Sequence, residues 1–297
     1  MALATEENPL LPPEEQPLTP GLYLVATPIG NLEDITLRAL RILRTADLIA
    51  CEDTRQTQKL LNHFNIPAKT ISYHQHNEQS RSEDLLTTLR EGGRVALVSD
   101  AGMPGISDPG AAVVNAAIAA GFPVFPVPGP NAALSALTAS GLDTENFQFL
   151  GFLPPRSGER RSLLEAHARD QSTLIFYEAP HRILDALTDI ESAMGPTRRI
   201  VLARELTKLH EEFLRGTATE IRSALATRDR QRGEMVLLIA AASPEEPTIK
   251  PASITDRINQ LAAEGLEEKE ALKQIARERN LSKSEAYREL QRERAKR

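Results

Sequence analysis

Tryptophan is absent from this chain of 297 residues, aromatic side chains make up only 4%, and the single cysteine is Cys51. One cysteine excludes an internal disulfide and is typical of a reducing compartment, so we expect a cytoplasmic protein. The scarcity of aromatic residues argues against a single-strand binder built on rows of stacked rings. No apolar run approaches the ~20 residues of a membrane span, and the N-terminus shows no signal-peptide pattern.

The glycine motifs of common nucleotide-binding folds are also missing. The sixteen glycines include no Gly-x-Gly pair, which excludes the Rossmann dinucleotide fingerprint, and no Gly-Lys dipeptide, which excludes a P-loop. A nucleotide-like ligand must therefore be held by loops of another kind.

Basic residues are outnumbered, and they are unevenly distributed. The formal net charge is −6, yet residues 253–297 hold eleven basic and nine acidic residues, a net of +2. Residues 1–252 then carry a net of −8. A basic end on an acidic body is typical of a nucleic-acid-binding arm. The alternative is a solvated helical element that serves packing or dimerisation.

Composition divides the chain into four parts. Residues 1–20 contain five prolines, four glutamates and no Lys or Arg, so we predict a disordered leader. We predict an N-terminal α/β domain over 21–128, a C-terminal α/β domain over 129–243 and a helical C-terminal module over 253–297. Three prolines within 243–252 indicate a linker before the module.

In the predicted N-terminal domain, short apolar runs alternate with segments of helical spacing. This alternation is typical of βαβ units and predicts a mostly parallel sheet. The predicted strands are 22–26, 47–51, 69–73, 94–99 and 124–127. The predicted helices are 36–46, 54–64, 79–90 and 109–120, and a helix at 131–140 leads into the next domain.

In the predicted C-terminal domain, some strands follow one another without a helix, which predicts a mixed sheet. The predicted strands are 147–153, 173–178, 199–206, 211–215 and 235–241. The predicted helices are 158–169, 181–193 and 217–227. We expect three further short helices within 253–294, with Asn280 and Leu281 in a turn and Ser282 as a helix N-cap.

Three loops follow the carboxyl ends of predicted strands and are rich in glycine and proline. They are TPIGN at 27–31, SDAGMPGISDPG at 99–110 and PGPNA at 128–132. Ligands of open α/β sheets bind beyond the carboxyl ends of the strands, so three such loops at one edge indicate a ligand site. Asp100 follows a strand directly, where a carboxylate can bind a ribose hydroxyl or an amine. Asp108 and Pro109 are predicted to be the N-cap and first residue of a helix.

These three loops, in this order, resemble those of the tetrapyrrole methylase family, also called class III methyltransferases. Further strings are similar to one branch of that family, whose members methylate a cytidine ribose 2′-hydroxyl of small-subunit ribosomal RNA. The strings are CEDTR (51–55), HNE (76–78), FLPPR (152–156), FYEAPHR (176–182), ARELTK (203–208) and RGE (232–234). The resemblance runs from about residue 21 to the C-terminus.

The resemblance implies two α/β domains with S-adenosylmethionine bound in a cleft between them, a homodimer, and 16S ribosomal RNA as the partner. It also implies a set of cofactor-binding residues drawn from both domains. These are Pro28, Gly30, Asp100, Ala101, Gly102, Ile106, Asn131, Ala132, Tyr177, Ala203 and Glu234.

Methyl transfer to a ribose hydroxyl needs a general base, because the hydroxyl is a weak nucleophile. Our first candidates are Glu52, Asp53 and Glu205, and each could instead be a salt-bridge partner, Asp53 with Arg55 or Glu205 with Arg204. Two further candidates are His76 and Glu178.

Three arginines, Arg55, Arg182 and Arg204, are candidates for binding RNA phosphates. His74 and His76 form an H-x-H pair, but no nearby Cys or His completes a ligand set, so we expect no metal. Cys51 is interpreted as a small buried residue.

Two other functions stay open from the sequence. One is a class III methyltransferase of a tetrapyrrole or another small molecule, against which the basic C-terminal module argues. The other is a non-catalytic RNA-binding factor of ribosome assembly, against which the intact cofactor loops argue. Binding of S-adenosylmethionine separates an enzyme from the non-catalytic factor.

Overall fold

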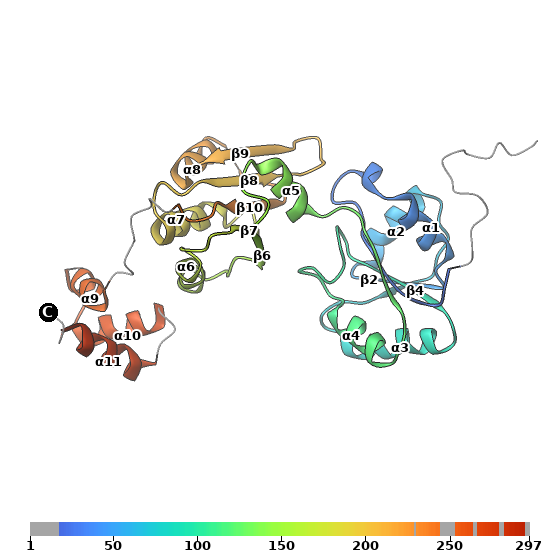
Figure 1. Cartoon of the computed structure of the whole chain (residues 1–297), viewed down its shortest axis with the longest axis horizontal. Helices are drawn as coiled ribbons and strands as arrows, with labels where there is room; N and C mark the ends of the chain where they lie inside the picture. The colour runs from blue at the N-terminus through green and yellow to red at the C-terminus, as the bar shows by residue number, and fades with distance from the viewer. Residues whose placement is uncertain (1–17, 229, 244–252, 264–265, 279–281, 295–297) are drawn as a thin grey trace, which may run out of the picture. The chain divides into compact units, whose positions relative to one another are not determined.

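The computed structural model describes residues 18–294 except 229, 244–252, 264–265 and 279–281. The chain divides into two compact units, and the boundary in the sequence falls between Ala132 and Ala133 (Figure 1). Most of the predicted leader, most of the linker, and the turn at Asn280 and Leu281 lie outside the described residues. No helix among the described residues is long and apolar enough to cross a membrane.

The first unit is built on a five-stranded sheet in the order β3-β2-β4-β1-β5. Every pair of neighbouring strands is parallel, as the alternating pattern predicts. The strands are β1 (Gly21–Val25), β2 (Leu48–Cys51), β3 (Thr70–Ser72), β4 (Arg94–Val98) and β5 (Val124–Val127). The helices are α1 (Leu37–Thr45), α2 (Thr54–His63), α3 (Glu78–Arg90) and α4 (Ala111–Ala119), with a 3-10 turn, η1, at Leu32–Asp34.

Both faces of this sheet are covered. Helices α1 and α2 lie on one face and α3 and α4 on the other (Figure 1). Successive strand residues therefore enter opposite cores: Ile49 and Cys51 pack with α1 and α2, whereas Leu48 and Ala50 pack with α3 and α4. This explains why the strands are continuous apolar runs rather than alternating ones. Cys51 is fully buried, which confirms its interpretation as a core residue.

The prediction that Asp108 caps the helix after β4 is wrong. Helix α4 begins two residues later than predicted. Its N-cap residue is Gly110, which has no side chain that could cap the helix. The Gly110 N–H donates to Glu78 Oε1 at 2.9 Å, and the Val113 N–H donates to the Tyr73 hydroxyl at 3.3 Å. The helix start is thus satisfied by the side chain of Tyr73, directly after β3, and by that of Glu78 in α3, and sequence spacing within α4 cannot reveal such partners.

The second unit holds a mixed sheet in the order β6-β7-β10-β8-β9, as predicted. Strands β6 and β7 are parallel, and the other neighbouring pairs are antiparallel. The strands are β6 (Phe147–Phe152), β7 (Thr173–Glu178), β8 (Ile200–Arg204), β9 (Glu212–Gly216) and β10 (Met235–Ile239). The helices are α5 (Ala132–Ser140), α6 (Ser157–Ala166), α7 (Ile183–Met194) and α8 (Ala218–Ala226).

One face of this sheet packs against α6, α7 and α8 through a single apolar core that includes Phe176, Leu187 and Leu237. Helix α5 is tied to β9 by a polar contact. The Arg215 guanidinium donates to the carbonyls of Ser140 at 3.1 Å and Ala139 at 2.6 Å. It thereby binds the carbonyl groups that a helix end leaves unpaired.

Three C-terminal helices, α9 (Ile254–Ala263), α10 (Glu268–Glu278) and α11 (Lys283–Arg294), share a small core of their own. Ser282 is the N-cap of α11, as predicted: the Glu285 N–H donates to its hydroxyl, and its own N–H donates to Glu285 Oε2 at 2.8 Å. Glu293 accepts from the N–H groups of Ile254 and Thr255 at 3.1 Å and so joins the end of α11 to the start of α9.

A buried ion pair joins α6 to α7 in the second unit. Arg160 and Asp189 are both buried, and the Arg160 Nε and Asp189 Oδ2 atoms lie 2.7 Å apart. Asp189 also accepts from the Ser157 hydroxyl at 3.0 Å. The guanidinium donates in addition to the Pro154 carbonyl at 3.2 Å, so both charges are well hydrogen-bonded.

We predict that Asp189→Ala lowers the free energy of unfolding of the second unit by about 3–5 kcal/mol, because it leaves the Arg160 charge buried and unpaired. Glu159→Ala is the matched control, since it removes the partner of the exposed Arg156 and should cost less than about 1 kcal/mol. Urea unfolding followed by circular dichroism measures both, with hydrogen exchange in β7 and α7 locating the change. Equal effects of the two variants would show that the buried pair adds no stability.

Candidate functional site

The loops that follow β1 and β4 are fastened to each other at the carboxyl edge of the first sheet. Thr27 and Gly102 form an isolated antiparallel bridge, with N–H···O distances of 2.9 and 3.0 Å. The buried Thr27 hydroxyl donates to the Ser99 carbonyl at 3.1 Å, and the Ser99 hydroxyl donates to the Gly102 carbonyl at 3.2 Å. Both loops are therefore held in one conformation by backbone contacts.

The loop after β5 packs against the end of β1, beside the two bridged loops. A Cβ on Gly129 would stand 2.9 Å from the Ala26 Cβ, which is too close for any side chain. Gly102 has a φ of +78°, and a Cβ at this position would stand 3.5 Å from the Ile29 side chain and 3.7 Å from the Pro130 carbonyl. The three loops predicted at one edge therefore do meet there, and glycine is required where their backbones approach.

The predicted cofactor residues of the first unit all lie in these loops or directly after them. Among them, Gly30, Asp100, Ala101 and Ile106 are exposed, while Gly102 is buried. The remaining members are partly buried: Pro28, Asn131 and Ala132. Their binding role stays a prediction.

Four carboxylates gather beside these loops, at the ends of β2 and β4. Burial raises the pKa of Asp108 to about 6, with help from the charges of Glu52 and Asp100. Burial also raises the pKa of Glu52, again with Asp100 contributing. Asp100 is exposed on one side, and partial desolvation by the surrounding loops raises its pKa, although the Asp53 N–H donates to its Oδ1 at 3.1 Å and opposes that shift. The edge is thus acidic and partly shielded from water.

Asp53 serves helix α2 as its N-cap. Its Oδ1 accepts from the backbone N–H of Arg55 at 2.8 Å, so the contact between these two residues is a cap rather than a salt bridge of side chains. The Arg55 residue itself is exposed.

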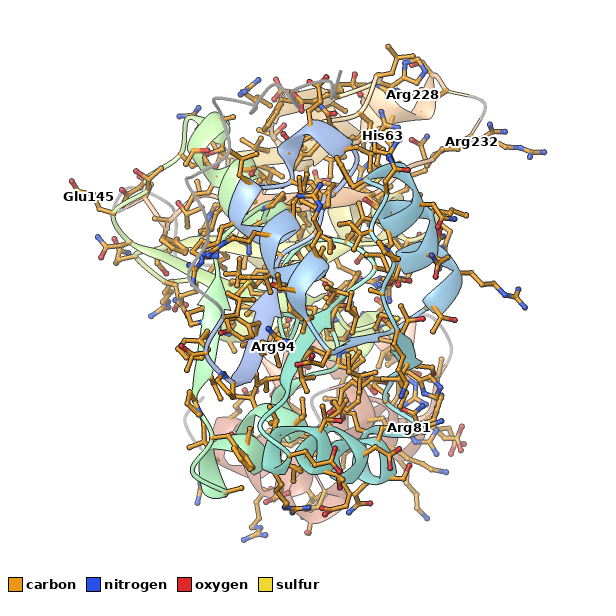
Figure 2. All side chains as sticks on the ribbon, turned by 90° about the vertical axis from the view of Figure 1, so that its right-hand side faces the viewer. His63, Arg81, Arg94, Glu145, Arg228 and Arg232 are labelled. Atoms are coloured by element: carbon orange, nitrogen blue, oxygen red, sulfur yellow. The ribbon has the colours of Figure 1, made fainter. Side chains whose placement is uncertain are left out.

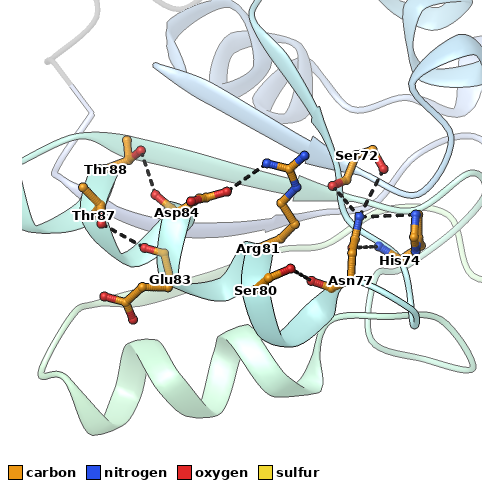
Figure 3. Close-up of polar contacts among 9 residues, drawn as sticks. All are labelled: Ser72, His74, Asn77, Ser80, Arg81, Glu83, Asp84, Thr87 and Thr88. Carbon is orange, nitrogen blue, oxygen red and sulfur yellow. Dashed lines mark hydrogen bonds and ion pairs between the residues drawn. The ribbon is translucent and has the colours of Figure 1, made fainter.

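The HNE string forms a turn between β3 and α3, and Asn77 organises it (Figure 3). The side-chain oxygen of Asn77 accepts from the backbone N–H of His74 at 2.8 Å. The side-chain NH₂ of Asn77 donates to the Ser72 carbonyl at 3.2 Å and contacts the His74 ring. His76 is exposed, and its ring meets the His74 ring edge-on. No group of three or more His, Cys, Asp or Glu among the described residues could hold a metal ion.

The second unit places Tyr177 and Ala203 in one register row, on either side of Val236. Tyr177 is partly buried, and Ala203 is fully buried. Glu234 lies just before β10 and is exposed. The three predicted cofactor residues of this unit therefore lie at the same end of the sheet, and their role stays a prediction.

The Glu205 carboxylate is bound on several sides. Its partner in an ion pair is Lys208 at 2.9 Å, rather than Arg204, and it also accepts from the Glu234 N–H at 2.9 Å. Burial alone would raise its pKa, but these two donors hold the pKa of Glu205 below its usual value. Its φ of +50° and its contact with Gly233 show how closely the ARELTK and RGE strings are joined.

Sequence reasoning missed the partners of the predicted arginines. Arg204 binds Glu212 at 2.6 Å, and Arg228 binds the same carboxylate at 2.7 Å, so the two arginines lower the pKa of Glu212 to about 2. Arg182 pairs with the buried Glu178 at 2.7 Å. Arg232 is exposed and its side chain points away from the ribbon (Figure 2).

A hollow of about 470 Å³ lies at the opposite, amino edge of the first sheet, beside the Arg94–Asp47 ion pair. It is lined by Leu18, Pro20, Asp47, Thr88, Glu91, Gly92, Gly93 and Arg94. Ligands of parallel sheets bind at the carboxyl edge, so we favour the three loops as the functional site.

Residues 21–222 match the family model of the tetrapyrrole (corrin/porphyrin) methylases. The chain belongs to this family. The resemblance carried by the sequence motifs is therefore confirmed, as is the fold of two α/β units followed by helices.

Curated relatives of this methylase extend the match beyond the family region. The chain is 50% identical to "Ribosomal RNA small subunit methyltransferase I" of Halalkalibacterium halodurans, over 90% of this chain and 93% of that protein. It is 48% identical to the protein of the same name from a Synechocystis species, over 90% of this chain and 95% of that protein. Among solved structures, the methyltransferase CobJ shares the fold, with a TM-score of 0.57 at 22% identity over 75% of this chain and 94% of CobJ.

We predict that Asp108→Asn raises the melting temperature near pH 7.5 and leaves it unchanged near pH 4. The folded-state pKa of about 6 lies above 3.8, the ordinary pKa of an aspartate side chain. The stability given by the protonated carboxyl is therefore fully present below about pH 4 and is lost as the pH rises through about 6. Asparagine stays neutral throughout and avoids that loss.

Thermal unfolding by circular dichroism at both pH values measures the effect. Asp84→Asn is the control, because Asp84 is exposed and pairs with Arg81 on the surface of α3. A change in melting temperature that is the same at both pH values would contradict the buried, titrating carboxyl.

Proposed function

We propose that this methylase transfers a methyl group from S-adenosylmethionine to a cytidine ribose 2′-hydroxyl of small-subunit ribosomal RNA. The observation that carries the proposal is the identity of about one half, over nine-tenths of the chain, to relatives named ribosomal RNA small subunit methyltransferase I. Such a substrate implies an enzyme of the cytoplasm. We propose a homodimer as well, on the resemblance alone.

The carboxyl edge of the first sheet fits S-adenosylmethionine chemically. The cofactor bears a sulfonium and an ammonium cation, and the edge presents the carboxylates of Asp100, Asp108 and Glu52. Opposite charges attract most strongly where water is partly excluded. Gly102 and Gly129 let the loop backbones pack closely, and the exposed residues Gly30, Asp100 and Ala101 leave this edge open to a ligand.

The bound cofactor supplies an electrophilic methyl group, and the protein supplies position and a base. Of our three first candidates, Glu52 suits the general base best, because its raised pKa lies nearer to neutral pH. Asp53 caps α2, and Glu205 is held by Lys208 with a lowered pKa. Glu178 is buried and paired with Arg182.

Phosphate binding is proposed for the three arginines, and Arg55 is the strongest of them. It is exposed at the start of α2, near the acidic edge. Arg182 and Arg204 already neutralise Glu178 and Glu212, so each would have to share its charge with a phosphate. Tyr177, Ala203 and Glu234 of the second unit stay proposed as cofactor contacts.

The proposed reaction is tested most simply on ribosomal RNA from cells with and without the gene. Mass spectrometry of nuclease digests should show that one 2′-O-methylated cytidine of the small-subunit RNA disappears when the gene is deleted. Identical digests from both strains would overturn the proposal. A lost methyl group on a base instead of a ribose would correct the acceptor atom only.

We predict that Asp100→Asn weakens S-adenosylmethionine binding at least tenfold, because the variant loses the charge at the cofactor edge. Asparagine keeps an oxygen that can accept from the Asp53 N–H, so the loop should stay folded. Calorimetry measures the affinity, and Asp84→Asn is the control on the outer surface of α3. Normal cofactor affinity in Asp100→Asn would remove this residue from the site.

Deletion of residues 253–297 should weaken binding to small ribosomal subunits and leave cofactor affinity unchanged. The segment is net +2 on a chain whose remainder is net −8, and phosphate contacts dominate affinity for RNA. Because α9, α10 and α11 have their own core, their removal should leave the two sheets intact. The salt dependence of RNA binding should become flatter.

The deletion experiment needs RNA affinity at two salt concentrations and the oligomeric state of the truncated protein. Substitution of Arg277, Arg288 and Arg292 by Gln is the matched variant that keeps the helices. Unchanged affinity with an unchanged salt slope would rule out an RNA-binding arm. Loss of the dimer would assign the module to assembly.

A further inference from the structure

Three of the twelve aromatic rings in the chain gather at one end of the second sheet. The Tyr177 ring lies between Phe149 and Phe152, with centroid distances of 4.9 and 5.5 Å and edge-on geometry to both. Phe149 and Tyr177 are partly buried, but Phe152 is 54% exposed. The Phe152 ring is therefore exposed to solvent, and the Tyr177 ring, which packs on Phe149, supports it from one side.

The backbone sets this exposure. The register between β6 and β7 shifts between Phe149 and Phe152, and Gly151 has a φ of +70°. After the shift, the Leu153 N–H donates to the Tyr177 carbonyl at 3.3 Å, and the Leu153 side chain is buried. Bulges of this kind re-aim a side chain, and they are frequent beside binding sites.

A cationic side chain follows the exposed ring in the loop after β6, and a histidine lies in the loop after β7. The loops after β6 and β7 leave the same edge, because these two strands are parallel neighbours. Arg156 follows Phe152 by four residues, and its side chain is 83% exposed. Its ion pair with Glu159 at 3.0 Å is a surface contact that a phosphate can replace. His181, after β7, is also exposed.

We propose that an unpaired base of the RNA substrate stacks on Phe152, with Arg156 at the adjoining phosphate. This inference rests on the proposed function, and Phe152 is a positioning residue in it. Single-stranded RNA is recognised by stacking of splayed bases on aromatic rings and by cations at the backbone. One exposed ring, followed in the adjoining loop by an exposed arginine whose ion pair with Glu159 is a surface contact, fits the placement of a single nucleotide. It also agrees with a chain too poor in aromatics for a long stacking surface.

Among the other exposed apolar side chains, Tyr287 of α11 also presents a ring, at 52% exposure, but it lies on the separate core of the C-terminal helices. Leu209 is more exposed than Phe152, and Ile118 is comparably exposed, but both are aliphatic and offer no ring face. Phe147 is 42% exposed, at the amino end of the same strand. It lies at the far end of β6 from Arg156 and provides a matched control.

The absence of tryptophan makes the stacking directly visible. Phe152→Trp introduces the only tryptophan of the chain, and its fluorescence should be quenched when a short oligocytidylate binds. An abasic oligomer of the same length, which keeps the phosphates, should quench little. Phe147→Trp should respond to neither RNA. Equal quenching of Phe152→Trp by the two oligomers would overturn the stacking.

Kinetics on small ribosomal subunits provide the second test. Phe152→Ala should raise KM about five- to hundredfold, the usual loss for one stacked base, and Phe152→Tyr should restore it. The affinity for S-adenosylmethionine should not change. If cofactor affinity falls by the same factor as kcat/KM, Phe152 acts through Tyr177 and the inference is wrong.

Two further outcomes are separable. Wild-type protein that methylates no ribosomal RNA would defeat the proposed function, whereas active wild type with an equally active Phe152→Ala would defeat only this inference. A blue shift of Phe152→Trp emission with rising protein concentration, without RNA, would mean that the ring lies between two copies of the chain.

Discussion

The carboxyl edge of the first sheet, where we propose the functional site, depends on one pair of backbone contacts, the bridge between Thr27 and Gly102. Parallel strands end side by side, but their loops are free to diverge unless something joins them. The two N–H···O bonds join the loops after β1 and β4, and the Gly129 backbone packs against Ala26. A ligand at this edge therefore meets a surface that is ordered before it binds, which lowers the entropy lost on binding.

Charge is organised differently in the two units. At the first edge, Glu52, Asp100 and Asp108 share a partly buried region, and their pKa values rise because burial and like charges oppose ionisation. In the second unit, carboxylates are matched by cations, and the pKa of Glu212 falls to about 2 between Arg204 and Arg228. Carboxylates without paired cations suit a cationic cofactor. The ion pairs of Glu212 instead join β9 to Arg204 of β8 and to Arg228.

Much of the fold follows from sequence patterns, because strand and helix periodicity and loop glycines are local signals. The predicted parallel and mixed sheets and the meeting of the three loops are confirmed. The failures concern the partners of polar side chains. Asp108 does not cap α4, because Glu78 and Tyr73 do. Glu205 pairs with Lys208 instead of Arg204, because the turn folds back on itself. The spacing of residues along the sequence does not indicate which of several charged side chains will lie nearest to a given carboxylate.

Amide hydrogen exchange at Thr27 and Gly102 tests most directly whether the bridge orders the proposed cofactor edge before the cofactor binds. In the protein without cofactor, both amides should exchange far more slowly than those of an open loop. Addition of S-adenosylmethionine should then slow exchange over residues 99–110. Loop-like exchange at Thr27 and Gly102 in the free protein, with protection appearing only on binding, would contradict the account.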